Sequence, residues 1–358
     1  MTASPTAGLA APDPGTAAPP APADRGSRPA AAPRWRRRAR AVAGYAATVF
    51  VLATLNFLLP RAMPGDPVDA LLAQGAAGFV HGQQTVDRLE EYYGLDKPLV
   101  EQYGAYLSRL ARGDLGRSVV TNTPVSHEIG RRLPWTLLLV GSSMLVATVV
   151  GIVAGIHSGW RRDRPMDRML MTALLVIREF PPFLLGSLLL FVFAVQLDWL
   201  PLAGAETSFS GSFGPVERVV DILRHLALPM FVLSIGLTVG NFLVMRAGMV
   251  NELGSDYLLL GRAKGLRPRD LKYRYAARNA LLPMVSLTAI QLGFAVTVNV
   301  LVERVFTYPG LGGLLFGAIG VRDYPTIQAG FLVISVSVVT LNALADLLYR
   351  RLDPRTAP

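Results

Sequence analysis

Polar and charged side chains that interrupt long apolar segments are the first candidates for chemistry in this sequence. In a membrane such groups are costly unless they face water or the interior of a helix bundle, so they indicate a path for a polar solute. A cation there can bind a solute carboxylate, and an anion can bind an amino group. The candidates for this translocation path are Arg178, Glu179, Asn241, Gln291 and Asn299.

The pair Arg178 and Glu179 lies in the middle of an apolar run and precedes Pro181-Pro182. Adjacent residues on a helix point about 100° apart, so the two charges need not pair with each other. Pro182 would leave the carbonyl of Arg178 without its helical donor and expose backbone polarity at this depth. Two interpretations stay open: the pair selects the solute, or it forms an interhelical salt bridge, for example with Arg246. The three amides have the same alternative, since amides within spans also form interhelical hydrogen bonds.

Catalytic signatures are missing from the sequence. It contains no G-x-x-x-x-G-K-[ST] phosphate loop, no G-x-S-x-G elbow and no H-E-x-x-H pair. There is no cysteine, and the four histidines do not have the spacing of metal ligands. We therefore predict that the chain is not an enzyme and holds no metal or cofactor. If it works against a gradient, ATP and Mg²⁺ are used by another polypeptide.

The most polar and basic stretch, residues 251–283, lies between two long apolar segments. Gly265 follows Lys264 as a helix-ending glycine does, with apolar Leu266 just beyond it. Pro268 suits the first position of a second helix. A basic helix-turn-helix between membrane spans must lie in water, and on the cytoplasmic side by the positive-inside rule.

The first of these helices combines apolar side chains with two cations, Arg262 and Lys264. Leu259, Leu260 and Ala263 suit packing into a cleft on a partner protein better than contact with lipid. A solvated hairpin whose charges only set the topology is the alternative.

Two runs in this stretch resemble the cytoplasmic loop of bacterial ABC-transporter permeases, and most closely the dipeptide, oligopeptide and nickel importer branch. They are Ala263-Lys264-Gly265-Leu266 and Arg278-Asn279-Ala280-Leu281-Leu282-Pro283. The sequence departs from that branch at Leu259-Leu260-Gly261 and at Arg267-Pro268. Further runs of the same family, in the same order, are Ala62-Met63-Pro64-Gly65-Asp66-Pro67, Arg112-Gly113-Asp114-Leu115-Gly116-Arg117-Ser118, Phe180-Pro181-Pro182-Phe183, Tyr308-Pro309-Gly310-Leu311-Gly312 and Arg322-Asp323-Tyr324-Pro325.

Composition agrees with a membrane protein. The chain has 358 residues, is 51% hydrophobic and carries a formal net charge of +10. The basic residues cluster at the ends of apolar segments, as positive-inside topology requires, and no aromatic-basic platform for nucleic acid is present. We predict an all-α polytopic membrane protein with six transmembrane helices and both termini in the cytoplasm. The spans are predicted at residues 41–59, 135–158, 169–195, 226–249, 284–302 and 327–349.

The remaining segments complete this topology. Residues 1–40 are predicted to be a disordered Ala/Pro-rich cytoplasmic tail that ends in a basic juxtamembrane run. Residues 60–134 are predicted to be extracytoplasmic, with short helices at 85–93 and 100–112. Residues 251–283 form the predicted cytoplasmic loop.

The resemblance implies a type I ABC importer permease fold and a set of partners. These are a second homologous permease that completes a heterodimer, two cytoplasmic ATPase subunits, an extracytoplasmic solute-binding protein and the lipid bilayer of the bacterial cytoplasmic membrane. It implies that the ATPase-coupling helix comprises Leu259, Leu260, Gly261, Arg262, Ala263, Lys264, Gly265 and Leu266. The implied substrates are di- or oligopeptides. The alternatives are nickel or another small solute within this branch and, in another class, a self-contained secondary transporter or channel.

Overall fold

A computed structural model describes residues 34–62, 97–208 and 210–352 of the chain. The tail predicted at residues 1–33 and the helix predicted at residues 85–93 lie outside these ranges. By its internal contacts the chain divides into two units, Met1–Ala47 and Thr48–Pro358. The described part of the first unit is the beginning of one helix, and all the packing reported below lies within the second.

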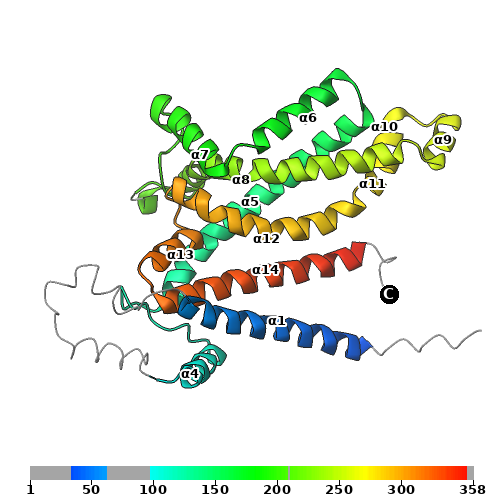
Figure 1. The fold of residues 1–358 in the computed structure, drawn as a ribbon. Helices are drawn as coiled ribbons and strands as arrows, with labels where there is room; N and C mark the ends of the chain where they lie inside the picture. The colour runs from blue at the N-terminus through cyan, green and yellow to red at the C-terminus, as the bar shows by residue number, and fades with distance from the viewer. Residues whose placement is uncertain (1–33, 63–96, 209, 353–358) are drawn as a thin grey trace, which may run out of the picture. The chain divides into compact units, whose positions relative to one another are not determined.

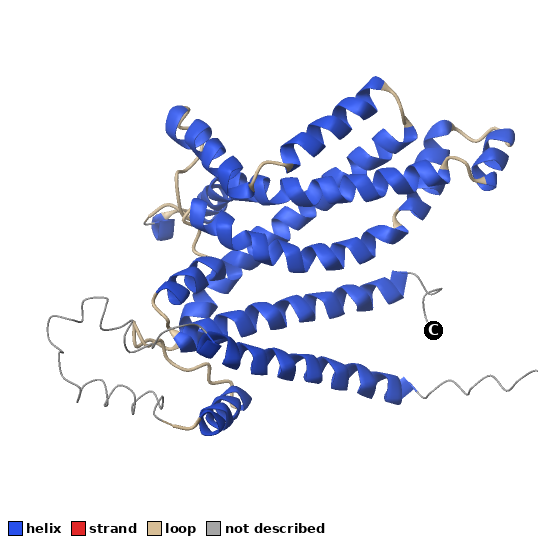
Figure 2. Ribbon diagram, viewed as in Figure 1, coloured by secondary structure: helices blue, strands red, loops and turns tan. Residues whose placement is uncertain are grey.

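The described residues are helical and form no strand beyond an isolated bridge between Arg117 and Pro124 (Figures 1 and 2). The longer helices are α1 (Arg34–Ala62), α4 (Leu99–Ala111), α5 (Val125–Trp160), α6 (Pro165–Arg178), α7 (Pro182–Leu190), α8 (Pro215–Glu252), α9 (Asp256–Ala263), α12 (Leu282–Val305), α13 (Leu311–Gly320) and α14 (Tyr324–Leu352). The short elements are α10 (Pro268–Asp270), α11 (Ala277–Ala280), the 3₁₀ turn η3 (Ser210–Ser212) and the π-helical segments η2 (Phe191–Gln196) and η4 (Leu271–Ala276).

Four helices in the described part of the chain are long and apolar enough to cross a membrane. They cover Val42–Ala62, Val125–Trp160, Pro215–Glu252 and Tyr324–Ala343, and the bent pair α6 with α7 and η2 adds a fifth if it counts as one span. Helix α12 covers the predicted span at 284–302. The total of six spans stays a prediction. Helix α4 confirms the helix predicted at 100–112.

The predicted third span is not one straight helix. Helix α6 ends at Arg178 and α7 begins at Pro182, with a bend of 96° between the two. Pro181 and Pro182 both lack a backbone N–H, and each also disfavours helical geometry in the residue before it. Two consecutive prolines therefore favour an end of α6 before Pro181 and a new helix start at Pro182.

Helices α5 and α8 form the centre of the second unit, and their contact depends on three glycines. A Cβ atom at Gly151, Gly155 or Gly159 would lie 2.5, 2.7 or 2.6 Å from the Cβ of Asn241, Met245 or Met249 respectively. Both sets of residues recur every four positions, so a row on α5 fits against a row on α8. Small residues permit such close backbone approach between membrane helices.

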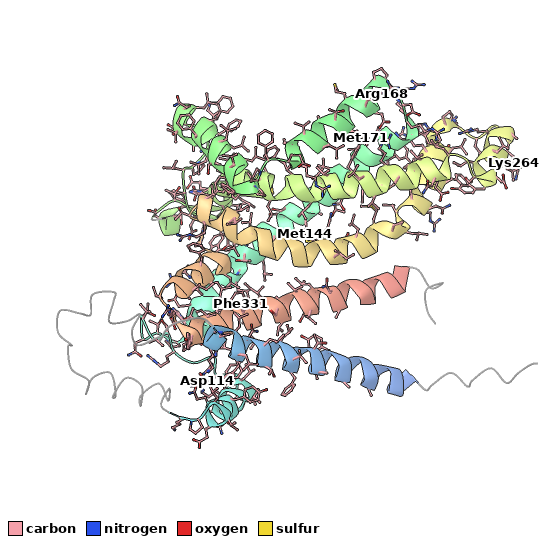
Figure 3. The ribbon with its side chains drawn as sticks, viewed as in Figure 1. Asp114, Met144, Arg168, Met171, Lys264 and Phe331 are labelled. Atoms are coloured by element: carbon pink, nitrogen blue, oxygen red, sulfur yellow. The ribbon has the colours of Figure 1, made fainter. Side chains whose placement is uncertain are left out.

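The apolar core is built around this helix pair. Side chains such as Leu139, Met144, Leu233 and Phe306 pack together within it, and Met144 lies midway along the helices in Figure 3. The connection at residues 198–214 leads into the first residue of α8, and the basic segment follows its last residue, Glu252. The basic segment therefore lies at the opposite end of α8 from the 198–214 connection.

Substitution of Gly155 by valine is predicted to destabilise the protein by about 1–3 kcal/mol, because overpacking separates α5 from α8. The Cβ of the new residue would lie 2.7 Å from the Met245 Cβ and 3.0 Å from the Phe242 carbonyl oxygen. Thermal unfolding of the detergent-solubilised protein measures the effect. Gly141→Val on the same helix is the control, since no atom lies within 4 Å of a Cβ there. Equal unfolding midpoints for the two variants would contradict this account of the core.

Candidate functional site

The basic segment folds as the predicted hairpin, and the turn after α9 has a defined cap. The Gly265 N–H donates to the Arg262 carbonyl at 3.0 Å, and the Leu266 N–H donates to the Gly261 carbonyl at 3.1 Å. Gly265 has φ +75°, a conformation that suits glycine. This is a Schellman motif, and Pro268 then occupies the first position of α10. Both sequence predictions for this turn are confirmed.

One face of α9 is exposed and apolar. Leu259 is 66% exposed and Leu260 is 55% exposed, and Ala263 is exposed beside them. The cations Arg262 and Lys264 are exposed next to this face, with Lys264 at the tip of the hairpin in Figure 3. We call Leu259, Leu260, Arg262, Ala263 and Lys264 the α9 face. Burying each leucine is worth about 1.5–3 kcal/mol, so the face is suited to a protein partner.

The opposite side of α9 packs inside the hairpin. Leu258 is fully buried, and Gly261 is buried where a Cβ would lie 2.6 Å from the Leu271 Cδ2. Of the eight residues predicted for coupling, Gly261 therefore does not reach the outer surface. It allows the two arms of the hairpin to meet, while Gly265 forms the turn and Leu266 lies at its edge.

Tyr257 joins the hairpin to the helices on both sides of it. Its hydroxyl donates to the Glu252 carboxylate at the end of α8 and accepts a hydrogen bond of 3.0 Å from Nδ2 of Asn279 in α11. Burial, together with the bond to Glu252, raises the pKa of the Tyr257 phenol above its ordinary value.

A close helix contact reinforces this joint. A Cβ at Gly248 of α8 would lie 3.1 Å from the Ala280 Cβ of α11. The hairpin is therefore in contact with α8 and α11, and α11 leads directly into α12.

The charged pair Arg178 and Glu179 lies at the bend between α6 and α7, and both side chains are exposed. Neither makes an ion pair with any residue that the structure describes. The interhelical salt bridge with Arg246 is not formed. Arg246 instead binds Asp167, at 2.8 Å from Nε to Oδ1 and 2.7 Å from Nη2 to Oδ2.

Asp167 was not recognised from the sequence, although it fixes the start of α6. Besides Arg246 of α8, it accepts hydrogen bonds from the Ser158 hydroxyl of α5 and, at 3.0 Å, from the Asp163 N–H. At the other end of α6, the side chains of Val176 and Arg178 are exposed. The helix is therefore anchored at its beginning and leaves Arg178 and Glu179 at its free end.

The three predicted amides are all buried, and they differ in their partners. Gln291 donates to the Leu237 carbonyl at 3.1 Å, and Asn299 donates to the Glu303 carboxylate at 2.5 Å. Asn241 is fully buried, and within the described part of the chain neither of its side-chain polar atoms has a hydrogen-bond partner. The bond of Gln291 thus joins α12 to α8, whereas the bond of Asn299 lies within α12. The structure does not bring any of the three together with Arg178 or Glu179.

Glu303 is a buried carboxylate that the sequence analysis did not single out. It is 1% exposed and accepts hydrogen bonds from the Thr136 hydroxyl at 2.8 Å, from Asn299 and from the Gly313 N–H at 2.9 Å. The Thr136 oxygen in turn accepts the Leu311 N–H at 2.8 Å. The carboxylate thus lies at the N-terminus of α13, where unpaired backbone donors favour an anion.

The glycines around Glu303 are required by its position. A Cβ at Gly310 would lie 1.9 Å from Glu303 Oε1, and one at Gly312 would lie 2.9 Å from Oε2. The run Tyr308-Pro309-Gly310-Leu311-Gly312 therefore forms a cradle for a carboxylate of the same chain. In the sequence, this cradle could have been suspected only from the position of Glu303, four residues after Asn299 and shortly before the glycine-rich run.

A second buried carboxylate, Asp323, holds the beginning of α14. It accepts hydrogen bonds from the hydroxyls of Ser118 at 2.5 Å and Thr326 at 2.7 Å, and from the Val119 N–H at 3.1 Å. The runs Arg112-Gly113-Asp114-Leu115-Gly116-Arg117-Ser118 and Arg322-Asp323-Tyr324-Pro325, which looked independent in the sequence, therefore meet. Within the described ranges, no group of three or more histidine and carboxylate side chains is arranged to hold a metal ion.

Comparison with known proteins agrees with this arrangement. Residues 147–358 match the family described as "Binding-protein-dependent transport system inner membrane component". The chain belongs to this family, and it is a multi-pass membrane permease subunit of an ABC importer.

Individual relatives cover almost the same length. The glutathione transport system permease protein GsiC of Escherichia coli (strain K12) is 36% identical over 311 residues, which are 87% of this chain and 95% of that protein. A putative peptide permease protein of Brucella suis biovar 1 (strain 1330) is 39% identical over 308 residues, which are 86% of this chain and 94% of that protein.

Substitution of Gly310 by alanine is predicted to lower the thermal unfolding midpoint, because the new methyl group would displace the Glu303 carboxylate from α13. Gly317→Ala in the same helix is the control, since a Cβ there meets no atom within 4 Å. Alanine in a helix interior is favoured over glycine by about 0.5–1 kcal/mol, so the control is expected to be neutral or stabilising.

The double variant Glu303→Ala with Gly310→Ala separates this explanation from a general effect at the turn. Because the two residues are in contact, its loss of stability is expected to be smaller than the sum of the two single losses. Additive losses would contradict a direct clash.

Proposed function

We propose that the chain forms half of the translocation path of an ATP-driven importer that takes up di- or oligopeptides across the bacterial cytoplasmic membrane. A separate binding protein delivers the peptide at the extracytoplasmic side. The names of the relatives support a peptide substrate, since one transports glutathione and another is a putative peptide permease. Nickel or another small solute is the alternative within this branch.

The observation that carries the coupling part of the proposal is the α9 face. Exposed leucines beside two cations, at the tip of a hairpin fixed to α8, suit a cleft on a cytoplasmic ATPase subunit. Nucleotide binding draws two such ATPase subunits together, and each carries its docked hairpin with it. Through Tyr257 and the contact of Gly248 with Ala280, that movement rocks α8 and α12 between inward-open and outward-open states.

A second permease subunit completes the path in this proposal. The bend region exposes large apolar side chains, including Phe180, Phe183 and Leu188. An exposed apolar face of this kind suits another membrane helix bundle as well as lipid. A homologous second chain would close the path and form a heterodimer, and Arg178 and Glu179 would then lie close to the shared path.

Replacement of Leu259 and Leu260 by aspartate is predicted to abolish copurification of the ATPase subunits, because two charges would have to be buried without partners. The matched control is Leu259→Met with Leu260→Met, which keeps an apolar face of similar volume. ATPase content per permease and solute-stimulated ATP hydrolysis are the measurements. Full copurification with the aspartate variant, or transport by the purified chain alone, would contradict the proposal.

The variants Arg178→Gln and Glu179→Gln test whether the bend selects the substrate. Loss of the cation is expected to weaken uptake of peptides with a free C-terminal carboxylate, and loss of the anion to weaken uptake of those with a free amino group. Loss of a hydrogen bond to a charged group corresponds to about tenfold or more in affinity. Competition among free, amidated and acetylated peptides provides the measurement, and an unchanged preference in a normally assembled complex would refute this role.

A further inference from the structure

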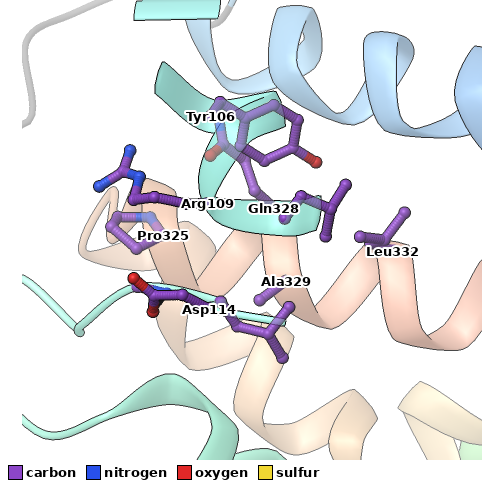
Figure 4. Close-up of a pocket in the computed structure, with 10 residues that line it drawn as sticks. Tyr106, Arg109, Asp114, Pro325, Gln328, Ala329 and Leu332 are labelled. Atoms are coloured by element: carbon purple, nitrogen blue, oxygen red, sulfur yellow. Dashed lines mark hydrogen bonds between the residues drawn. The ribbon is translucent and has the colours of Figure 1, made fainter. Parts of the chain in front are cut away.

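The second unit contains a small cavity between α4, α14 and the loop at residues 114–116, remote from the α9 face. Its α4 wall is formed by Tyr106, Arg109 and Leu110, which share one side of that helix. The α14 wall presents Pro325, Gln328, Ala329 and Leu332, again at helical spacing. Figure 4 shows Tyr106, Arg109 and Gln328 among the labelled side chains around the cavity, with the Arg109 guanidinium directed outward.

Both walls are held in place by hydrogen bonds outside the cavity. The Thr54 and Tyr103 hydroxyls are 2.7 Å apart, and Arg61 Nη2 donates to Gln102 Oε1 at 2.7 Å, so α4 is fixed to α1. The loop is fixed to α14 by the bonds of Asp323 to Ser118 and Val119. Hydrogen bonds therefore hold the α4 wall to α1 and the loop wall to the beginning of α14.

Two polar atoms of the cavity walls are buried and have no hydrogen-bond partner among the residues that the structure describes. They are the Tyr106 hydroxyl and Nε2 of Gln328, whose side chain is 9% exposed. A buried donor without an acceptor is costly, so each such group in a native protein needs an explanation. The amide Nε2 can only donate and the phenol readily donates, so an occupant that suits both is a group that accepts two hydrogen bonds.

The charges at the mouth favour an anionic acceptor. Arg109 is exposed at the rim of the cavity. The one carboxylate in the wall, Asp114, already accepts the Gly116 N–H through Oδ1 at 2.9 Å. The cavity holds about 40 Å³. Since one water-sized sphere needs about 10–15 Å³, this is room for roughly three heavy atoms, the number in a carboxylate group.

We propose that this cavity binds a carboxylate, with Tyr106 and Gln328 donating to its oxygens and Arg109 balancing its charge. The same chemistry can come from an acidic side chain of the docked binding protein or from a free small carboxylate such as a peptide terminus. The choice between these sources rests on the proposed function, whereas the carboxylate site itself does not.

Saturation-transfer NMR on the assembled complex in lipid nanodiscs tests the site with acetate as the probe and acetamide as its uncharged counterpart. Acetate is expected to bind and acetamide to bind more weakly. Arg109→Gln and Gln328→Leu should each weaken acetate binding about tenfold, as expected for loss of one hydrogen bond to a charged group. Arg112→Gln, a substitution of the next arginine of this segment and outside the cavity, is the control and should bind as the unmodified chain does.

Equal acetate binding by all variants, or equal binding of acetate and acetamide, would overturn the proposal and assign the cavity to ordered water. Arg109→Gln keeps this test valid if Gln328→Leu disturbs folding, because Arg109 is exposed. Acetate binding needs no ATPase or transport, so it can persist if the proposed importer function fails.

A second measurement assigns the source of the carboxylate. If an acidic side chain of the binding protein occupies the site, acetate competes with that protein and Arg109→Gln weakens its binding. If a free carboxylate occupies the site, the affinity for the binding protein is unchanged while peptides with an amidated C-terminus lose their effect on acetate binding.

Discussion

The close approach of α5 and α8 is the constraint on which the rest of the second unit depends. Gly151, Gly155 and Gly159 let the two backbones meet along several turns, which no larger side chain permits. Between lipid-exposed helices the hydrophobic effect contributes little, so packing of this kind supplies the association energy. The joined pair then provides the frame to which the hairpin, the bent third segment and the 303–323 region are attached.

Three buried carboxylates fix the beginnings of helices in this unit. Asp167 holds the beginning of α6 to α5 and α8, Glu303 lies at the beginning of α13 beside Thr136 of α5, and Asp323 holds the beginning of α14 to the loop after α4. Each is paired with hydroxyl, amide or guanidinium donors, as a buried charge must be. Each also lies at or near a helix N-terminus, where the helix dipole stabilises a negative charge.

Local features of the sequence were the ones that predicted structure well. Gly265 and Pro268 specify the turn of the hairpin through their own backbone preferences, and the apolar runs at 135–158 and 226–249 lie within α5 and α8. The bend at Pro181-Pro182 was underestimated because a kink in one span and a break between two helices have the same local pattern. Tertiary packing decides between them.

Partners far apart in the sequence could not be predicted. Asp167 and Arg246 are 79 positions apart, and Thr136 and Glu303 are 167 positions apart. Nothing in the local pattern of an acidic residue says which distant donor it meets. For the same reason Arg246 was considered as a partner for Arg178 and Glu179, whereas in the structure it binds Asp167.

The cradle around Glu303 has a consequence for how this protein can change over evolution. Because a methyl group at position 310 would occupy the volume of the carboxylate, the two positions cannot vary independently. A descendant that acquires a side chain at 310 must first, or at the same time, shorten residue 303 and so give up the anion at the start of α13. Divergence in this corner of the molecule is therefore expected to proceed by paired replacements.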